Sequence, residues 1–265
     1  MIKNIIKYLI AKYPIIITYL GSQLKHEHLV ELIMYKQNEI KEYLNTYEII
    51  WLSKYLIINK EIFLSQLGQD IFVDTVLGSK EVGFFVEIGV GNGKKLSNSY
   101  FLEKSRYWNG ILCEPNVDYH NSIEAIRSAK LVKEAIWSSS NKLMKFKKVL
   151  DLGELSQLLV VEEQNHDKHN RDNSIIYDVN TLSFNDLHSY HKMPLQIDYL
   201  SIDTEGSELE ILKNIDFNKF NIKCITIEHN YNSHSMKSFD RILNDFGYKK
   251  FNSKLSLWDS WYYKE

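Results

Sequence analysis

Three glycines at alternate positions follow an acid at the end of a short apolar run: Glu87 is followed by Gly89, Gly91 and Gly93. Glycines let a tight turn bring backbone N–H groups close to a ligand. A dinucleotide fingerprint needs its third glycine at position 94, which is Lys94, and a carboxylate before the turn repels a pyrophosphate. The pattern favours S-adenosylmethionine, because the acid attracts its α-ammonium group and the turn can bind its carboxylate.

A second acid ends the next strand-like run. Glu114, which precedes Pro115, lies about 20 residues beyond the glycines, the interval at which such folds place the carboxylate that binds ribose hydroxyls. A third run ends near Ala135 and Ile136, where backbone and apolar groups could enclose an adenine ring. A plain core strand is the alternative interpretation of this third run.

Polar residues end two later strand-like runs, Asp203 with Glu205 in one and Glu228 with His229 in the other. The carboxyl ends of parallel strands meet at one edge of a sheet, so we expect these residues to surround the transferable methyl group. His229 or Glu205 could act as a general base that takes the proton of a hydroxyl. Alternatively, Asp203 and Glu228 with His229 or Asn230 could hold a divalent cation, or the cluster could be a structural hydrogen-bond network.

Apolar runs of strand length alternate with helix-spaced runs from residue 84 onward. This alternation predicts an α/β fold with a parallel, doubly wound sheet, ending in a hairpin that turns one strand antiparallel. Expected strands are 84–88, 108–114, 131–137, 143–149, 197–203, 222–228, 248–251 and 257–263; expected helices are 70–77, 94–103 (with Leu96 buried), 116–129, 207–214 and 238–246.

Two stretches fall outside this alternation. Residues 1–64 carry helix-spaced apolar positions, with no glycine between Gly21 and Gly68, which predicts a helical N-terminal extension. Residues 151–195 are polar and rich in histidine and asparagine, which predicts a loop insertion, with a short strand and helix near its end, that acts as a substrate lid. The catalytic domain would then span 65–265.

The composition limits the kinds of partner and the compartment that we expect for this chain. The formal net charge of −2 provides no general field for nucleic acid. Cys113 and Cys224, the two cysteines, lie in apolar runs and predict reduced core thiols in a cytoplasmic protein. The apolar stretch 5–20 is too short, and too interrupted by lysine and proline, for a transmembrane span. Residues 1–20 suit either peripheral contact with a membrane or docking on the domain or on a second subunit, which leaves a homodimer open.

Together the motifs resemble the FkbM family of S-adenosylmethionine-dependent methyltransferases, from about residue 65 to the C-terminus. The resemblance implies a class I methyltransferase (Rossmann-like) fold with seven strands. Relatives mostly methylate hydroxyls of sugars and polyketide-type products, and they often carry Asp where this chain has Glu87. The matching segments are 65–70, 85–93, 96–98, 110–116, 197–208 and 227–230, of which Asp-Thr-Glu-Gly-Ser-Glu at 203–208 is the most specific.

We therefore expect an O-methyltransferase that acts on a sugar hydroxyl of a small molecule, glycan or glycoconjugate. The alternatives are a nicotinamide-dependent oxidoreductase, for which no hydride-relay residue is found, and a non-catalytic cofactor-binding scaffold. The predicted cofactor-binding residues are Glu87, Gly89, Gly91, Asn92, Gly93, Asn98, Glu114, Pro115, Ala135, Ile136 and Asp203. The predicted catalytic residues are His229, Glu205 and Asp203, and a bound Mg²⁺ would use Asp203, Glu228 and His229.

Overall fold

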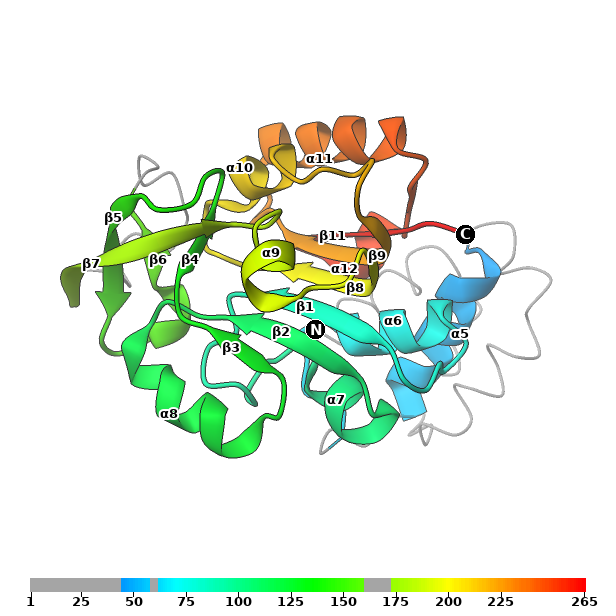
Figure 1. Cartoon of the computed structure of the whole chain (residues 1–265). Coiled ribbons are helices and arrows are strands. Elements are labelled where there is room, and N and C mark those ends of the chain that lie inside the picture. The colour runs from blue at the N-terminus through cyan, green and yellow to red at the C-terminus, as the bar shows by residue number, and fades with distance from the viewer. Residues whose placement is uncertain (1–43, 58–61, 160–172) are drawn as a thin grey trace.

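The computed structural model describes residues 44–57, 62–159 and 173–265. Strands and helices alternate along these residues (Figure 1). The helices are α5 (Thr46–Ile57), α6 (Gln69–Val76), α7 (Tyr100–Arg106), α8 (Val117–Ile126), α9 (Leu187–His191), α10 (Glu208–Lys213), α11 (Ser233–Asp245) and α12 (Ser253–Ser256), with a 3₁₀ turn η1 (Gly153–Leu155). The strands are β1 (Phe84–Ile88), β2 (Asn109–Cys113), β3 (Lys130–Val132), β4 (Ala135–Trp137), β5 (Leu143–Val149), β6 (Gln157–Leu158), β7 (Ser174–Ser183), β8 (Gln196–Ile202), β9 (Asn221–Glu228), β10 (Lys249–Lys250) and β11 (Asp259–Tyr263).

Seven strands form the central sheet in the order β10-β11-β9-β8-β1-β2-β3. Neighbouring strands are parallel except that β11 runs antiparallel to both β9 and β10. The predicted seven-stranded, mostly parallel sheet is confirmed, although α12 rather than a tight turn joins β10 to β11. The strand order reverses between β1 and β8, which is where open sheets of this kind bind ligands.

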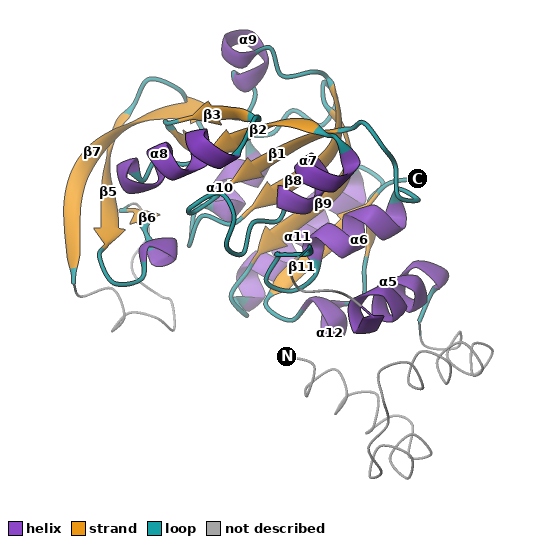
Figure 2. Cartoon of the chain, turned by 90° about the horizontal axis from the view of Figure 1, so that it is seen from below, coloured by secondary structure: helices purple, strands orange, loops and turns teal. Residues whose placement is uncertain are grey.

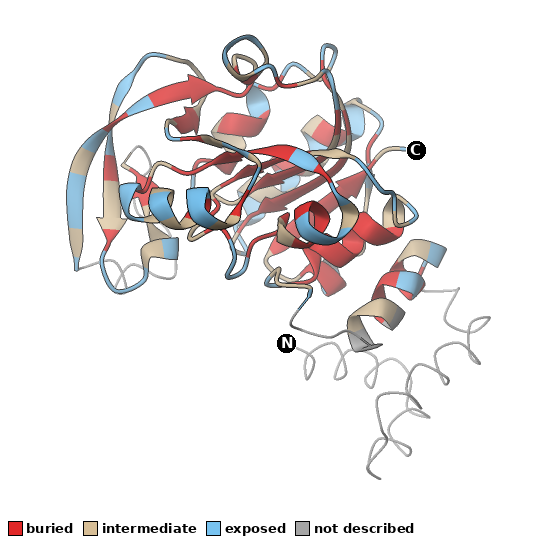
Figure 3. Cartoon of the chain, turned by 60° about the horizontal axis from the view of Figure 1, so that its bottom comes forward, coloured by how far each residue is buried: buried red, intermediate tan, exposed pale blue. Residues whose placement is uncertain are grey.

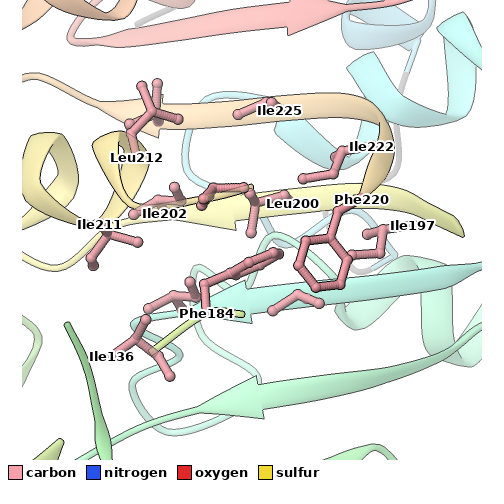
Figure 4. Packing of buried hydrophobic residues seen from close by; sticks show 14 of the residues in the cluster. Ile136, Phe184, Ile197, Leu200, Ile202, Ile211, Leu212, Phe220, Ile222 and Ile225 are labelled. Carbon is pink, nitrogen blue, oxygen red and sulfur yellow. The ribbon is translucent and has the colours of Figure 1, made fainter. Parts of the chain in front are cut away.

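Side chains of the central strands alternate between two apolar layers. Tyr199 and Trp261 pack in the layer that includes α5, α6 and α7, whereas Leu200 and Tyr262 pack in the layer that includes α10 and α11. Figure 4 shows the second layer, where aliphatic side chains of β8, β9 and α10 meet two phenylalanine rings. The strands between the layers are buried (Figure 3), which explains their continuous apolar sequence.

A second, four-stranded sheet in the order β4-β7-β5-β6 flanks the first (Figure 2). Residues 131–137, expected as one strand, are divided between the sheets: β3 pairs with β2, and β4 pairs with β7. Ala135 and Phe146 belong to a small apolar core that holds the second sheet together. The prediction of a single strand was wrong because nothing local in the sequence marks the step between the two sheets.

The predicted loop insertion 151–195 is in part a component of this second sheet. It contributes β6 and the ten-residue strand β7, and the strand and helix expected near its end are the end of β7 and α9. The loop prediction was wrong for β7 because Ile175 and Ile176 stand side by side, and both are exposed, so no alternating pattern marks the strand. The rest of the insertion, 160–172, lies outside the described residues.

The helix predicted at 94–103 begins only at Tyr100, as α7. Leu96, expected to be buried, is 39% exposed and has a φ of 62°. The preceding loop is held away from helical geometry because the buried carboxylate of Glu87 accepts a hydrogen bond of 2.7 Å from the backbone N–H of Asn98. An acid in one strand therefore overrides the local helical pattern of the segment that follows it.

The described part of the N-terminal extension is helical and docked on the domain. In α5, the fully buried Trp51 packs edge-on against Trp261 and donates a hydrogen bond of 2.9 Å to the carbonyl of Gly68. The predicted membrane contact of residues 1–20 lies outside the described residues, and the boundary at 64–65 stays a prediction. Among the helices that are described, none has the length and apolar character needed to cross a membrane.

The docking of α5 can be tested by stability. Trp51→Ala removes a fully buried ring, so we expect the free energy of unfolding to fall by ~3–5 kcal/mol. Ile50→Ala on the same helix is the control, because Ile50 is 40% exposed and its truncation should cost less than ~1 kcal/mol. Urea denaturation of the full chain measures both, and equal losses would contradict the docked arrangement.

Candidate active site

A cavity of about 620 Å³ opens at the carboxyl ends of the central strands. Its volume lies in the range of small-molecule and cofactor sites. The predicted residues that line it are Gly89, Gly91, Asn92, Asn98, Glu114, Pro115, Ala135, Ile136, Asp203, Glu205 and Glu228. Three predicted residues do not line it: Glu87, Gly93 and His229. The structure thus brings both ends of the predicted site, the glycine turn and the later acids, into one space.

The glycine turn lies where β1 meets β8. Gly89 has a φ of 82°, and a Cβ added there would lie 1.6 Å from the carbonyl oxygen of Asp203. Only glycine allows this approach of two backbones. Gly93, by contrast, faces α8, where an added Cβ would meet Ile123 at 3.0 Å. Of the two, Gly89 shapes the cavity and Gly93 serves helix packing.

Glu114 binds the glycine turn directly. Its Oε2 accepts hydrogen bonds from the N–H groups of Val90 (3.0 Å) and Gly91 (2.8 Å), and its Oε1 accepts one from Asn116 (2.8 Å). Burial raises the pKa of Glu114 to about 7 in spite of these bonds. The two N–H groups are therefore engaged by Glu114, although the sequence suggested a cofactor carboxylate as their partner. A carboxylate has about four acceptor sites, so Glu114 retains capacity for a ribose hydroxyl.

Glu87 lies behind the cavity wall, not in it. Besides the N–H of Asn98, it accepts hydrogen bonds from the hydroxyls of Ser97 (3.0 Å) and Ser99, and Arg127 Nη1 lies 4.0 Å away. Burial raises the pKa of Glu87, and the charge of Arg127 partly offsets this effect. These contacts make Glu87 a residue that positions its neighbours, in contrast to the predicted direct contact with an ammonium group.

Asn98 lines the cavity and has an unused hydrogen-bond acceptor. Its backbone N–H is held by Glu87, and its Nδ2 donates to Ser201 Oγ at 2.9 Å. Its Oδ1 is buried and has no hydrogen-bond partner within the described part of the chain. A buried carbonyl oxygen without a partner is costly unless a ligand supplies a donor. Asn98 is therefore the residue of this wall that is poised to accept a hydrogen bond from a ligand.

Acids gather at the cavity where β8 and β9 end. Asp203, Glu208 and Glu228 each place a carboxylate oxygen within 4.8 Å of the other two. Glu208 Oε1 is already engaged by the backbone N–H groups of Thr204 (2.8 Å) and Gly206 (3.0 Å), so it also fixes the loop. Crowded like charges of this kind either share protons or bind a cation.

Asp203 and Glu228 are the strongly perturbed pair of this cluster. Burial, followed by the charges of neighbouring acids, raises the pKa of each carboxyl well above its usual range, and the two are joined by a hydrogen bond. Asn230 Nδ2 also donates to Glu228 Oε2 at 2.8 Å. The two carboxyls therefore titrate as one unit, which keeps its proton to a higher pH than an ordinary carboxyl does.

His229 stands apart from this cluster. It is 4% exposed, and its Nδ1 accepts a hydrogen bond of 3.0 Å from the backbone N–H of Tyr231. Burial lowers the pKa of His229 to about 4, so the ring is neutral at pH 7. A ring whose acceptor nitrogen is engaged and which does not line the cavity is unsuited to take a substrate proton. The structure brings Asp203 and Glu228 together with Glu208, not with the predicted His229.

Several residues that line the cavity were not predicted. They come from the start of α6 and the segment before it, from α8, from η1 and the second sheet, and from the loops after β9 and before β11. They include Gln66, Gln69, Tyr119, Phe146, Leu155, Leu158, Tyr231 and Trp258. The aromatic residues near the C-terminus were visible in the sequence, but Trp261, Tyr262 and Tyr263 are buried and only Trp258 reaches the cavity. No local pattern separates this one tryptophan from its buried neighbours.

Comparison with known proteins finds one family whose model matches most of the chain. The family described as "Methyltransferase FkbM domain" matches residues 87–250. No curated protein sequence matches the chain. Similar solved structures include precorrin-6y C5,15-methyltransferase from Geobacter metallireducens GS-15, with 13% identity, TM-score 0.39 and coverage of 72% of this chain and 76% of that chain. Another is the N-terminal domain of human METTL16 in complex with SAH, with 12% identity, TM-score 0.38 and coverage of 88% and 92%.

The raised pKa values predict that stability falls as pH rises. A carboxyl whose pKa is about 7 in the fold and 4.5 in the unfolded chain binds more protons when folded, so its stabilising contribution is lost as pH rises through 7. We expect the free energy of unfolding to be ~1–3 kcal/mol higher at pH 5.5 than at pH 8, as measured by urea denaturation.

Substitution of Glu114 isolates its contribution to the pH dependence of stability. Glu114→Gln should flatten the pH dependence, whereas Glu81→Gln, at an exposed acid, should leave it as in the unmodified chain. A pH dependence of the same slope in Glu114→Gln would refute the assignment of the raised pKa to Glu114.

Proposed function

The chain belongs to the family of FkbM-domain methyltransferases and is an S-adenosylmethionine-dependent methyltransferase, and we propose that it transfers the methyl group to a hydroxyl of a sugar, in a glycan or glycoconjugate. The observation that carries this proposal is the single cavity that joins Glu114 and the glycine turn to the acids Asp203 and Glu228. One end suits the adenosine of the donor, and the other suits a hydroxyl that must lose a proton.

In this proposal the adenosine lies between the glycine turn and the second sheet. Glu114 accepts a ribose hydroxyl, and the adenine packs on the apolar wall that Ala135, Ile136, Phe146 and Leu158 of the second sheet present to the cavity. When bound, S-adenosylmethionine supplies an activated methyl group on a sulfonium. This placement follows the general rule for ligands at the switch point of an open sheet.

The methionine end of the donor extends toward Asn98 and Asp203. Asn98 Oδ1 accepts a hydrogen bond from the α-ammonium group, which satisfies an oxygen that otherwise has no partner among the described residues. Glu87 acts through Asn98, whose backbone N–H it holds. The negative charge of the acid cluster favours the sulfonium cation beside it.

Asp203 and Glu228 receive the proton of the hydroxyl. Bound S-adenosylmethionine would supply the methyl group and would be released as the neutral thioether, while the hydroxyl that takes the methyl group would give its proton to the carboxylate of the pair. A raised pKa makes this carboxylate a stronger base than an ordinary one. Glu205 also lines the cavity beside the pair. Alignment of oxygen, methyl and sulfur contributes further to the rate.

A second role for the same acids has its own support. The oxygens of Asp203, Glu208 and Glu228 lie close enough together to hold a divalent cation such as Mg²⁺, which would orient acceptor oxygens and acidify one of them.

The two buried free cysteines, Cys113 and Cys224, favour the cytoplasm as the compartment.

Asn98 provides a test of cofactor placement. Asn98→Ala removes one hydrogen bond to a charged group, so we expect the Kd for S-adenosylhomocysteine to rise about tenfold or more. Asn180→Ala, an exposed asparagine on β7, is the control and should leave the Kd unchanged. Isothermal titration calorimetry of the full chain measures both, with NAD as a ligand that should not bind. An unchanged Kd for Asn98→Ala would remove Asn98 from the site.

The acid pair provides a test of the chemistry. Asp203→Asn and Glu228→Gln should each lower kcat for methyl transfer by about 10²–10⁴-fold, the usual contribution of a general base. The ionised pair is the base, and its pKa is raised, so the rate of the unmodified enzyme should increase with pH as the pair loses its proton, at a higher pH than for an ordinary carboxylate base. Radiolabelled methyl transfer measures the rate, with Asp245→Asn at an exposed helix end as control.

Metal dependence separates the two roles of these acids. If the pair acts as a base without metal, dialysis against EDTA leaves kcat unchanged. If EDTA abolishes transfer and Mg²⁺ restores it, the cation role replaces the proton-sharing role. Full activity of both Asp203→Asn and Glu228→Gln would contradict either one.

A further inference from the structure

Two aromatic rings stand at the acid end of the cavity. Tyr231 follows β9 and Trp258 precedes β11, and both line the cavity. Their ring centroids lie 6.4 Å apart with an interplanar angle of 67°. Tyr231 is 59% exposed, whereas Trp258 is half-buried. In the cofactor placement described above, S-adenosylmethionine does not contact this aromatic surface beside the acids.

The backbone holds this aromatic pair in place. The carbonyl of Trp258 accepts hydrogen bonds from the N–H groups of His229 (2.9 Å) and Asn230 (3.1 Å), which ties the two loops together. Asn230 and Tyr231 both have positive φ values, 45° and 59°, which residues other than glycine adopt only where the surroundings impose them. The loop after β9 is therefore built to present Tyr231 at this position.

His229 is the side chain that fixes Tyr231. Its Nδ1 accepts the backbone N–H of Tyr231 at 3.0 Å, and its ring lies 6.1 Å from the tyrosine ring. Burial of His229 keeps this acceptor in one orientation. The histidine that the sequence suggested as a base thus has a positional role within the acceptor end of the cavity.

The charged side chains that line this end of the cavity are of one sign. Asp203, Glu205 and Glu228 line the same end of the cavity. Among the described residues that line the cavity, Lys95 carries the single basic side chain, and it is paired with Glu154 at 3.1 Å. A phosphate or carboxylate group on the acceptor would meet this cluster of acids without a compensating cation, which disfavours binding.

We propose that the acceptor is an uncharged glycoside whose apolar ring face packs on Tyr231 and Trp258, with His229 as the residue that positions Tyr231. Sugar rings present C–H groups on one face, which pack on aromatic side chains, and hydroxyls at the edge, which suit carboxylate acceptors. The inference rests on the proposed transfer to a sugar hydroxyl, and it specifies the charge of that sugar and the surface that recognises it.

Binding tests the inference separately from methyl transfer. The full chain, saturated with S-adenosylhomocysteine, is titrated with a panel of neutral methyl glycosides, the matching uronic acids and the matching sugar phosphates, and binding is followed by saturation-transfer NMR. We expect at least one neutral glycoside to bind at least tenfold more tightly than its uronate and phosphate counterparts. Equal or tighter binding of a charged counterpart, or no binding of any glycoside, would overturn the inference.

Substitutions test whether Tyr231 belongs to the glycoside-binding surface. Tyr231→Ala should weaken glycoside binding about tenfold, which corresponds to ~1.4 kcal/mol, because the sugar loses the aromatic surface on which its apolar face packs. Tyr190→Ala is the matched control, because Tyr190 is 63% exposed on α9 and does not line the cavity. The Kd for S-adenosylhomocysteine should stay the same in both. An unchanged glycoside affinity in Tyr231→Ala would overturn the aromatic assignment.

His229 is tested by KM and kcat with the best neutral glycoside. His229→Ala should raise KM with little change in kcat, and His229→Asn should restore KM, because an Asn Oδ1 can accept the same N–H. A large fall in kcat in both variants would instead assign His229 a role in the chemistry and overturn the positional one. The proposed function fails separately, if mass spectrometry finds the transferred methyl group on an atom other than a hydroxyl oxygen.

Discussion

The contact on which the site depends is the approach of Gly89 to the backbone of Asp203. A side chain at Gly89 would overlap the carbonyl oxygen of Asp203, so β1 and β8 can run side by side to their ends only with glycine there. At this point the chain leaves β1 toward α7 and leaves β8 toward α10, and the cavity opens between the two connections. Glu114 and Asp203 face one space because this pair of strand ends is in contact.

Around this contact the fold buries more carboxyl groups than stability alone would favour. Glu87 is satisfied by serine hydroxyls, a backbone N–H and the nearby Arg127, and it organises a wall. Asp203 and Glu228 have no such cation beside them in the described structure, and burial, followed by the charges of neighbouring acids, raises the pKa of each well above its usual range. A buried carboxylate whose negative charge is offset by a nearby cation and hydrogen-bond donors serves the structure. A buried carboxylate without such a cation is suited to bind a cationic ligand or to transfer a proton.

The sequence predicted the site correctly where a residue type at a given position has one common structural role. Glycines before a helix and acids at strand ends predicted the sheet edge and most of the cavity lining, including Glu114 and Asp203. It was less informative where a side chain can choose among several hydrogen-bond partners in the folded chain. Glu87 was expected to face a ligand, but serines that follow it in sequence bind it first. His229 was expected to act on the substrate, yet its partner is a backbone N–H only two residues away.

The strand β4 belongs to the second sheet but supplies Ala135 and Ile136 to the cavity wall. Only two residues separate it from β3, which lies at the edge of the central sheet. In the proposed placement, the donor site is shared between two sheets that only two residues connect. An interaction that repacks the second sheet and moves Ala135 or Ile136 would then change the affinity for the donor, and donor binding would stabilise that packing by the same free energy. Natural variation in β5 and β7, far from the glycine turn, can thus tune how tightly the enzyme retains its cofactor product.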